Sequence, residues 1–345
     1  MNYRYPGPQS FGEKDESLFF GRRKETKALL DLILVQSLVV LFAKSGMGKT
    51  SLLQAGIIPK LRFTEYDPIV IRLNDPKVSL ENQVLRRLTP NVSPNSTLWS
   101  EIVHYNQISN GTPLLIFDQF EEIFTLYSEG QREKFVSQLA DVINGTLPES
   151  IRKQIGNKIT KEHVVPSEIA ILEQLPKVKI VLSIRSDLLH FLHLLSPEIP
   201  SILRNRFELL GLQPDQAREA IINPAKQTQA SGDFASQPFA LTSKALDQII
   251  NHLSQRKHSD YFESSQRVQI ESFQLQLLCE YIERKVISEY PKVATSLILL
   301  TSHFFGGNEG IEEVLSRFYS NTLENITDLS QLSKAQRLLE DHLIK

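Results

Sequence analysis

The sequence predicts an α/β fold with a doubly wound parallel sheet, followed by an all-helical region. Five short apolar runs alternate with amphipathic stretches as far as residue 212. Strands that alternate with helices in this way indicate a parallel sheet. From Asp215 onward the strand signal disappears and only helical periodicity continues.

The predicted strands are short and apolar, as expected of strands that are buried on both faces. They cover residues 38–42, 69–73, 114–117, 180–184 and 207–212. Ligands of such sheets bind at the carboxyl ends of the strands. Functional side chains are therefore expected in the segments that follow these runs.

Helical periodicity separates the strands and continues after them. Helices are predicted over residues 22–35, 49–57, 80–88, 98–108, 132–143, 187–195, 216–227, 243–253, 273–288, 311–323 and 334–344. Residues 145–176 interrupt the alternation, because this stretch is charged and carries only scattered apolar residues. It is predicted to be a surface insertion with one or two short helices.

The length of 345 residues exceeds what one hydrophobic core usually serves. The expected division is an extended lead-in over residues 1–18, an α/β domain over 19–213, a helical domain over 214–290 and a further domain from 291 to 345. The net charge of −2 argues against a general nucleic-acid binder. No signal peptide, disulfide framework or membrane span is evident. We therefore expect a cytoplasmic protein without a membrane partner.

The run from Ala43 to Thr50 is a phosphate-binding loop between a predicted strand and a predicted helix. Such a loop needs small residues so that backbone N–H groups can point at a polyanion, a lysine for the β- and γ-phosphates and a hydroxyl for Mg2+. Alanine replaces the usual first glycine. The pattern indicates an α/β P-loop NTPase, and the residues expected to hold nucleotide are Ser45, Gly46, Met47, Gly48, Lys49, Thr50 and Ser51.

Two further strands end in polar clusters that suit nucleotide chemistry. Asp118 follows the strand 114–117 and is predicted, with Thr50, to hold Mg2+. The next residue is Gln119 where many hydrolysing relatives carry glutamate, so either Glu121 or Glu122 is expected to be the catalytic base. Arg185 ends the strand 180–184 and is placed to sense a γ-phosphate; the alternative is a surface ion pair.

These residues resemble the signal-transduction ATPases with numerous domains, in the novel STAND NTPase group. The resemblance rests on Phe19-Phe20-Gly21-Arg22 with Glu25, on the phosphate loop and its helix, on Asp118-Gln119-Phe120-Glu121-Glu122 and on Arg185-Ser186-Asp187. A lead-in of Pro6-Gly7-Pro8 and Phe11 and helical signatures near Pro214 and Phe273 add to it. The similarity extends from about residue 6 to about residue 325.

The resemblance implies an ATP/ADP switch in which a helical domain and a winged-helix domain, here partial, clamp the nucleotide. It implies Mg2+, oligomerisation on activation, slow hydrolysis and a role in signal transduction, in bacteria often in antiviral defence or regulation. It places Phe20, Arg22 and Pro214 near adenine, although Phe19 and Phe20 could equally be core residues. Effector and sensor parts are expected either in a longer chain or in separate proteins.

Two other functions remain open on the sequence. One is a mechanical ATPase of the AAA+ or origin-recognition type, which needs an arginine supplied to a neighbouring site; Arg204 and Arg206 are the candidates. The other is an ATP-binding module that does not hydrolyse, suggested by Gln119.

Overall fold

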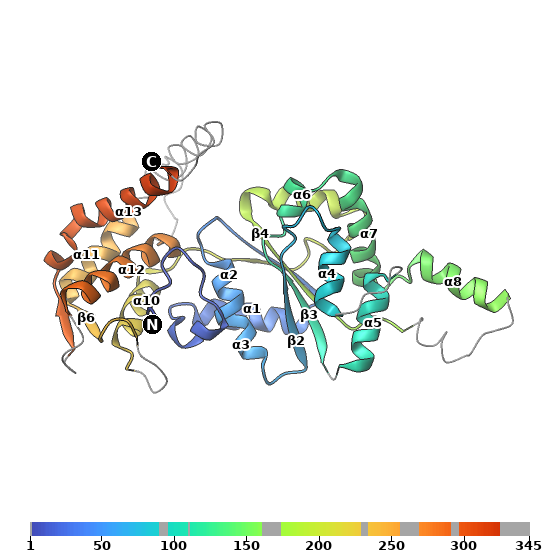
Figure 1. Ribbon diagram of the computed structural model, residues 1–345, viewed down its shortest axis with the longest axis horizontal. Coiled ribbons are helices and arrows are strands. Elements are labelled where there is room, and N and C mark those ends of the chain that lie inside the picture. Colours follow the sequence, from blue (N-terminus) through green and yellow to red (C-terminus); the bar gives the residue numbers. More distant parts are fainter. Residues whose placement is uncertain are drawn as a thin grey trace. The chain divides into compact units, whose positions relative to one another are not determined.

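The structure, a computed structural model, describes residues 2–89, 96–109, 111–160, 174–228, 234–255, 269–290 and 297–324. The chain divides into two compact units, whose elements Figure 1 labels. The sheet unit consists of the described parts of residues 24–45 and 56–209. The helical unit consists of the described parts of residues 1–23, 46–55 and 210–345.

A five-stranded parallel sheet forms the centre of the sheet unit, in the order β2-β3-β4-β1-β5. The strands are β1 (Leu38–Ala43), β2 (Tyr66–Ile71), β3 (Thr112–Phe117), β4 (Lys179–Arg185) and β5 (Arg206–Glu208). β1, β3 and β4 are buried over most of their length, which their continuous apolar sequence dictates. The predicted doubly wound parallel sheet is confirmed.

Helices cover the two faces of this sheet. In Figure 1, α4 (Leu80–Leu88), α5 (Leu98–Ile108) and α7 (Glu129–Asn144) lie on one side, while α1 (Arg23–Val35) and α3 (Ile58–Leu61) lie on the other. α4 and α5 begin where predicted because Ser79 and Thr97 cap them, each accepting a hydrogen bond from a backbone N–H of the first turn. The short α6 (Glu122–Leu126) follows β3, and α8 (Glu149–Thr160) is one helix of the predicted insertion.

Several elements of the sheet unit differ from the prediction; α7, for example, begins at Glu129 rather than at residue 132, and β3 begins at Thr112 rather than at residue 114. β2 begins at Tyr66 rather than at residue 69, and it contains Pro68, which an edge strand tolerates. β5 ends at Glu208 rather than at residue 212, because the chain there passes into the other unit. The helix predicted over 187–195 is a 3₁₀-helix, η3 (Ser186–Leu195).

The helix after the phosphate loop is longer than predicted and is not a uniform α-helix. It begins as α2 (Lys49–Ser51), continues as the π-helical η2 (Leu52–Ile57) and ends with α3 at Leu61. Gly56 and Pro59 together indicated an end near residue 57. A proline is tolerated in the first turn of a helix, and here it lies in the first turn of α3.

The helical unit contains α10 (Pro214–Lys226), α11 (Ser243–Gln255), α12 (Ser272–Glu289), the 3₁₀-helix η4 (Ser302–Phe305) and α13 (Gly307–Glu324). Two strands that the sequence did not predict, β6 (Phe239–Leu241) and β7 (Ile298–Leu300), pair in parallel. Runs of three residues are too short to show a strand period. The four helices share one core that includes Leu275, Leu278 and Ile311. The helix predicted over 334–344 lies outside the described residues.

The N-terminal segment of the helical unit is part of the packed structure. This segment precedes the 3₁₀-helix η1 (Glu13–Leu18). Arg4 and Tyr5 are both 1% exposed, and Tyr5 lies in the same core as α10 and α12. Backbone N–H groups of Arg4 and Tyr5 donate to the carboxylate of Glu283 on α12. The extended lead-in is therefore anchored, which its Pro- and Gly-rich composition did not indicate.

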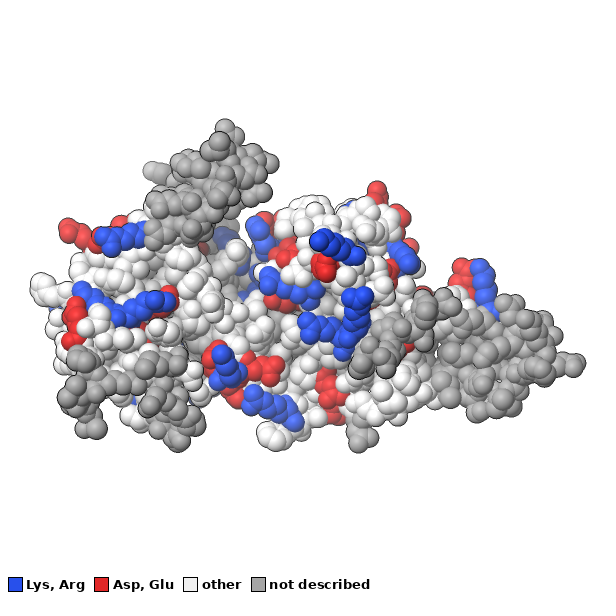
Figure 2. Space-filling view, viewed as in Figure 1, with Lys and Arg blue, Asp and Glu red and all other residues white. Residues whose placement is uncertain are grey.

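Charge is mixed on the face that Figure 2 shows, where basic and acidic side chains are interspersed over the described residues. Among the described helices, none combines the length and the hydropathy that crossing a bilayer requires.

Candidate nucleotide site

The carboxyl ends of β1, β3 and β4 meet at one edge of the sheet. Ala43, the last residue of β1, is the register partner of Arg185, the last residue of β4. Phe117, which ends β3, is the register partner of Leu182. Because β4 lies between the other two strands, Asp118 and Arg185 belong to the edge at which the phosphate loop leaves β1. The sequence predicted this convergence, and the register confirms it.

The phosphate loop has the backbone geometry of an anion cradle. Gly46 and Gly48 have φ of 75° and 92°, in the left-handed region that favours glycine. Gly48 is the N-cap of α2, and its carbonyl accepts from the N–H of Leu52. Ser45 and Gly46 are exposed, Met47 is buried, and Lys49 and Thr50 are half-buried. Left-handed residues that alternate with right-handed ones make the N–H groups of such a loop converge on an anion.

From Gly46 onward the loop packs against elements of the helical unit. Phe273, in the first turn of α12, donates its N–H to the carbonyl of Gly46 at 3.1 Å. The carbonyl of Met47 accepts from Ser272 Oγ at 3.2 Å and from the guanidinium of Arg22 at 3.0 Å. A Cβ on Gly46 would lie only 3.1 Å from Cβ of Phe273, so α12 packs directly on the loop.

The Phe19-Phe20-Gly21-Arg22 motif lies against α10. Gly21 has φ of 81°, and a Cβ there would lie 2.4 Å from the carbonyl oxygen of Gln216. Only glycine allows this approach. Pro214 begins the same helix two residues before Gln216, so the structure brings the motif and Pro214 to one region of the helical unit.

The two phenylalanines of the motif differ in their surroundings. Phe19 packs on Phe11 with ring centroids 5.5 Å apart and joins a small cluster with Leu18, Ala55 and Phe234. Phe20 is half-buried. Phe19 is thus a core residue, while the role of Phe20 beside adenine remains a prediction. Ser51, predicted to bind nucleotide, accepts a hydrogen bond at Oγ from the N–H of Phe11 and so also holds the N-terminal segment.

Asp118 is 6% exposed and is held from both neighbouring strands. Its N–H donates to the carbonyl of Ile71 on β2, and its Oδ1 accepts from Ser183 Oγ on β4 at 3.4 Å. The N–H of Phe120 also donates to the carbonyl of Ser183. The carboxylate is therefore fixed at the sheet edge, as a metal ligand must be.

Gln119 has φ of 57° and is the one non-glycine residue with positive φ among those described. Such a conformation costs a residue other than glycine about 1 kcal/mol. We expect Gln119→Gly to raise the free energy of unfolding by roughly that amount, measured by urea denaturation. Gln119→Ala is the control, since it keeps the strain. If Gln119→Gly lowered the free energy of unfolding as much as Gln119→Ala does, this account would be contradicted.

Glu121 and Glu122 lie in the turn that follows. Glu121 is buried, and Glu122 Oε1 lies 4.0 Å from the guanidinium of Arg72. The Oε2 of Glu122 is buried and has no hydrogen-bond partner among the described residues. Burial raises the pKa of Glu122; the charges of Glu121 and Asp118 add to this rise, while Arg72 opposes it. A raised pKa brings a carboxylate closer to the range of a general base at neutral pH.

Arg185 has an ion-pair partner two residues along the chain. Its Nε and Nη2 donate to the two carboxylate oxygens of Asp187, at 3.1 and 2.7 Å. Both side chains are about half exposed, and pairs of this kind contribute at most about 1 kcal/mol. A phosphate could therefore compete for Arg185. Arg204 and Arg206 are exposed.

A family model decides the class of the protein. The model for Novel STAND NTPase 1 matches residues 5–249, from the N-terminal segment through the phosphate loop into α11. The chain belongs to this family. It therefore contains a STAND-type P-loop NTPase domain, as the resemblance in its sequence indicated. A search of curated protein sequences gives no match.

Two solved structures share the fold of this STAND NTPase at low sequence identity. The Walker-type ATPase PABY2304 of Pyrococcus abyssi aligns with a TM-score of 0.52 at 12% identity, covering 96% of this chain and 79% of its own. The Aeropyrum pernix ORC1 protein in complex with DNA aligns with a TM-score of 0.53 at 12% identity, covering 99% and 79%. At these identities the likeness concerns the P-loop α/β fold followed by helices.

Several residues around the STAND site were not foreseen from the sequence. Ser272 contacts the loop from more than 220 positions away. Ser183, on β4, contacts Asp118, and Arg72, just after β2, contacts Glu122. A serine that starts an apolar helix reads as a cap, so its tertiary contact gives no local signal. Ser183 is a polar residue inside an apolar run, which was the one available hint.

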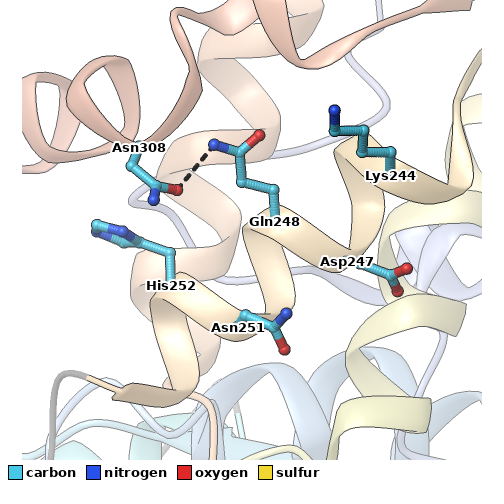
Figure 3. A pocket seen from close by; sticks show the side chains of 6 residues that line it. All are labelled: Lys244, Asp247, Gln248, Asn251, His252 and Asn308. Atoms are coloured by element: carbon cyan, nitrogen blue, oxygen red, sulfur yellow. Dashed lines mark hydrogen bonds between the residues drawn. The ribbon is translucent and has the colours of Figure 1, made fainter.

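The helical unit of this STAND NTPase also carries a shallow polar pocket of about 550 Å³. Figure 3 shows that its side chains point in different directions rather than converging. Several already have partners: Gln248 donates to Asn308, His252 pairs with Glu312 and Asp247 pairs with Arg218. We assign no ligand to it, because a binding site needs polar groups that converge on one point.

Proposed function

We propose that this protein is an ATP-binding, slowly hydrolysing molecular switch, in which the ATP or ADP state is passed to the helical unit. One observation carries the proposal: from Gly46 to Ala55 the phosphate loop and its helix pack in the helical unit rather than in the sheet unit. Phe273, the α12 residue that contacts the loop, also packs edge-to-face on Phe318 of α13, with ring centroids 5.4 Å apart. A change at the phosphates therefore has a packed route into α12 and α13.

Binding of the triphosphate is assigned to the loop and the residues after it. The amides of residues 45–50 and the ammonium of Lys49 would hold the phosphates, and the following helix directs its N-terminus at them. Phe20 and Pro214 are assigned to the adenine, because Gly21, the residue after Phe20, lies against Gln216 in the first turn of α10, the helix that Pro214 begins. ATP rather than GTP follows from the family resemblance and not from this chemistry.

Mg2+ suits the donor set. Magnesium is usually held by one or two carboxylates together with phosphate oxygens and water. Asp118 offers a fixed, 6% exposed carboxylate, and Thr50 offers the hydroxyl of the loop. When bound, the ion neutralises charge on the β- and γ-phosphates. Arg185 would leave Asp187 to meet the γ-phosphate.

Hydrolysis needs a base, and we assign it to Glu122 in preference to Glu121. We expect Glu122→Gln to lower ATP turnover about 100-fold while ATP affinity stays unchanged. A base must be deprotonated, and the pKa of Glu122 is raised. Wild-type turnover should therefore fall on acidification at a higher pH than an ordinary glutamate, pKa about 4.3, would give. Steady-state phosphate release against pH measures this, with Glu121→Gln as the matched variant. Loss of turnover only in Glu121→Gln would reverse the assignment.

The switch itself is tested by hydrogen exchange in the helical unit. We expect the amides of α12 and α13 to exchange at different rates with ADP and with a non-hydrolysable ATP analogue, because α12 contacts the loop and α13 packs on Phe273 of α12. Helix α4, in the sheet unit, is the internal control. Equal exchange of α12 and α13 in the two states would contradict the switch.

The output of the switch follows the family resemblance. We propose assembly into a homo-oligomer in the ATP state, with signalling or antiviral defence through effector and sensor parts, in the cytoplasm. Sedimentation velocity with ADP and with the ATP analogue tests the assembly. A monomer in both states at micromolar concentration would contradict it.

A further inference from the structure

The carbonyl groups of the phosphate loop are held from outside the cradle. Phe273 N–H donates to the carbonyl of Gly46, while Ser272 Oγ and Arg22 Nη2 donate to the carbonyl of Met47. Both carbonyls therefore have donors on the side of α12.

The direction of a carbonyl fixes that of the amide in the same peptide plane. In a trans peptide the C=O and the following N–H point in opposite directions, and there are no cis peptides among the described residues. With the carbonyls of Gly46 and Met47 tied toward α12, the N–H groups of Met47 and Gly48 must point away from it. That is the side on which a loop of this kind takes its anion.

Arg22 is bound to the outside of the same loop. It is 4% exposed, and its Nη1 donates to the carbonyl of Leu210 at 2.8 Å. Its Nη2 donates to both the Met47 carbonyl and Ser272 Oγ, at 3.0 and 2.9 Å. Ser272 Oγ in turn donates a hydrogen bond to the carbonyl of Met47. The fork of a guanidinium can meet these acceptors together, whereas an ammonium cannot.

We propose that Ser272 and Arg22 are positioning residues for polyphosphate: they set the amides of Met47 and Gly48 toward the phosphates. The proposal rests on the proposed nucleotide function and deepens it. It assigns Arg22 to the phosphate end of the ligand, where the family resemblance had placed it beside adenine. It also makes the start of α12 a part of the phosphate site.

The test compares a ligand that has a base with one that has none. ATP and inorganic tripolyphosphate, each with Mg2+, are titrated calorimetrically into wild type, Ser272→Ala, Ser272→Thr and Arg22→Lys. We expect Ser272→Ala and Arg22→Lys to weaken both ligands by the same factor, about 10-fold, since each loses a hydrogen bond to the loop. Ser272→Thr keeps the hydroxyl and should bind like wild type.

Three results would overturn the proposal. If Arg22→Lys weakens ATP but not tripolyphosphate, Arg22 acts on the nucleoside. If Ser272→Ala binds both ligands as wild type does, the hydroxyl does not position the loop. If Ser272→Thr loses as much as Ser272→Ala, the loss reflects packing. Wild type that binds neither ligand would instead refute the proposed nucleotide function. Circular dichroism confirms folding, and Ser272→Ala removes a single oxygen from a half-buried position.

Discussion

Lys49→Ala is expected to weaken ATP binding by about 100-fold or more, the largest effect on ATP affinity of any single change proposed at the site. Lys49 is the first residue of α2 and follows the left-handed Gly48, so its side chain starts from the backbone beside the loop amides. Hydrogen bonds between an ammonium and a phosphate are charge-assisted and worth about 1.5–3 kcal/mol. A loss of about 2.7 kcal/mol corresponds to 100-fold in affinity.

The neighbouring Lys44 supplies the matched control. It belongs to the same loop and carries the same charge, but it is exposed and precedes the glycines. Lys44→Ala removes one positive charge from the loop without touching the residue assigned to the phosphates. Titration calorimetry with ATP and Mg2+ should therefore separate the two variants clearly. Wild-type affinity in Lys49→Ala would show that the site has been assigned to the wrong residues.

The sequence predicted the sheet and its functional edge well because both depend on local patterns. Apolar runs gave all five strands, and the polar residues after them gave Asp118 and Arg185 at the edge that the register confirms. The glycines of the loop could be read in the same way, because a left-handed backbone needs that residue type wherever it occurs.

What the sequence could not predict are contacts between distant segments. Ser272 and Phe273 begin a helix, and nothing in their neighbours indicates that they contact residues 46 and 47. The strands β6 and β7 also give no local signal, because three residues are too few to show a strand period. Burial of the N-terminal segment has the same origin, because the partner of Arg4 lies 279 positions away.

The second large effect concerns stability rather than binding: Arg4→Ala is expected to destabilise the helical unit by about 3–5 kcal/mol. The guanidinium of Arg4 donates to Ser236 Oγ and to the carbonyls of Pro224, Gln227 and Ser236. Its Nε lies 4.0 Å from the fully buried Glu283. Alanine would leave that carboxylate without its countercharge and three carbonyls without this donor. A buried charged or polar group that loses its partner lowers the free energy of unfolding.

Two measurements locate the effect of Arg4→Ala. Circular dichroism reports helices of both units, whereas Trp99, the only tryptophan, lies buried in the sheet unit and reports that unit by fluorescence. We expect the dichroism midpoint in urea to fall. Arg284→Ala is the control, because Arg284 lies next to Glu283 but is itself exposed and forms a partly exposed pair with Glu280, worth at most about 1 kcal/mol. An Arg4→Ala midpoint no lower than that of Arg284→Ala would mean that the N-terminal segment is not held by this ion pair. The proposed route from the phosphate loop would be unaffected, since its contacts with α12 do not include Arg4.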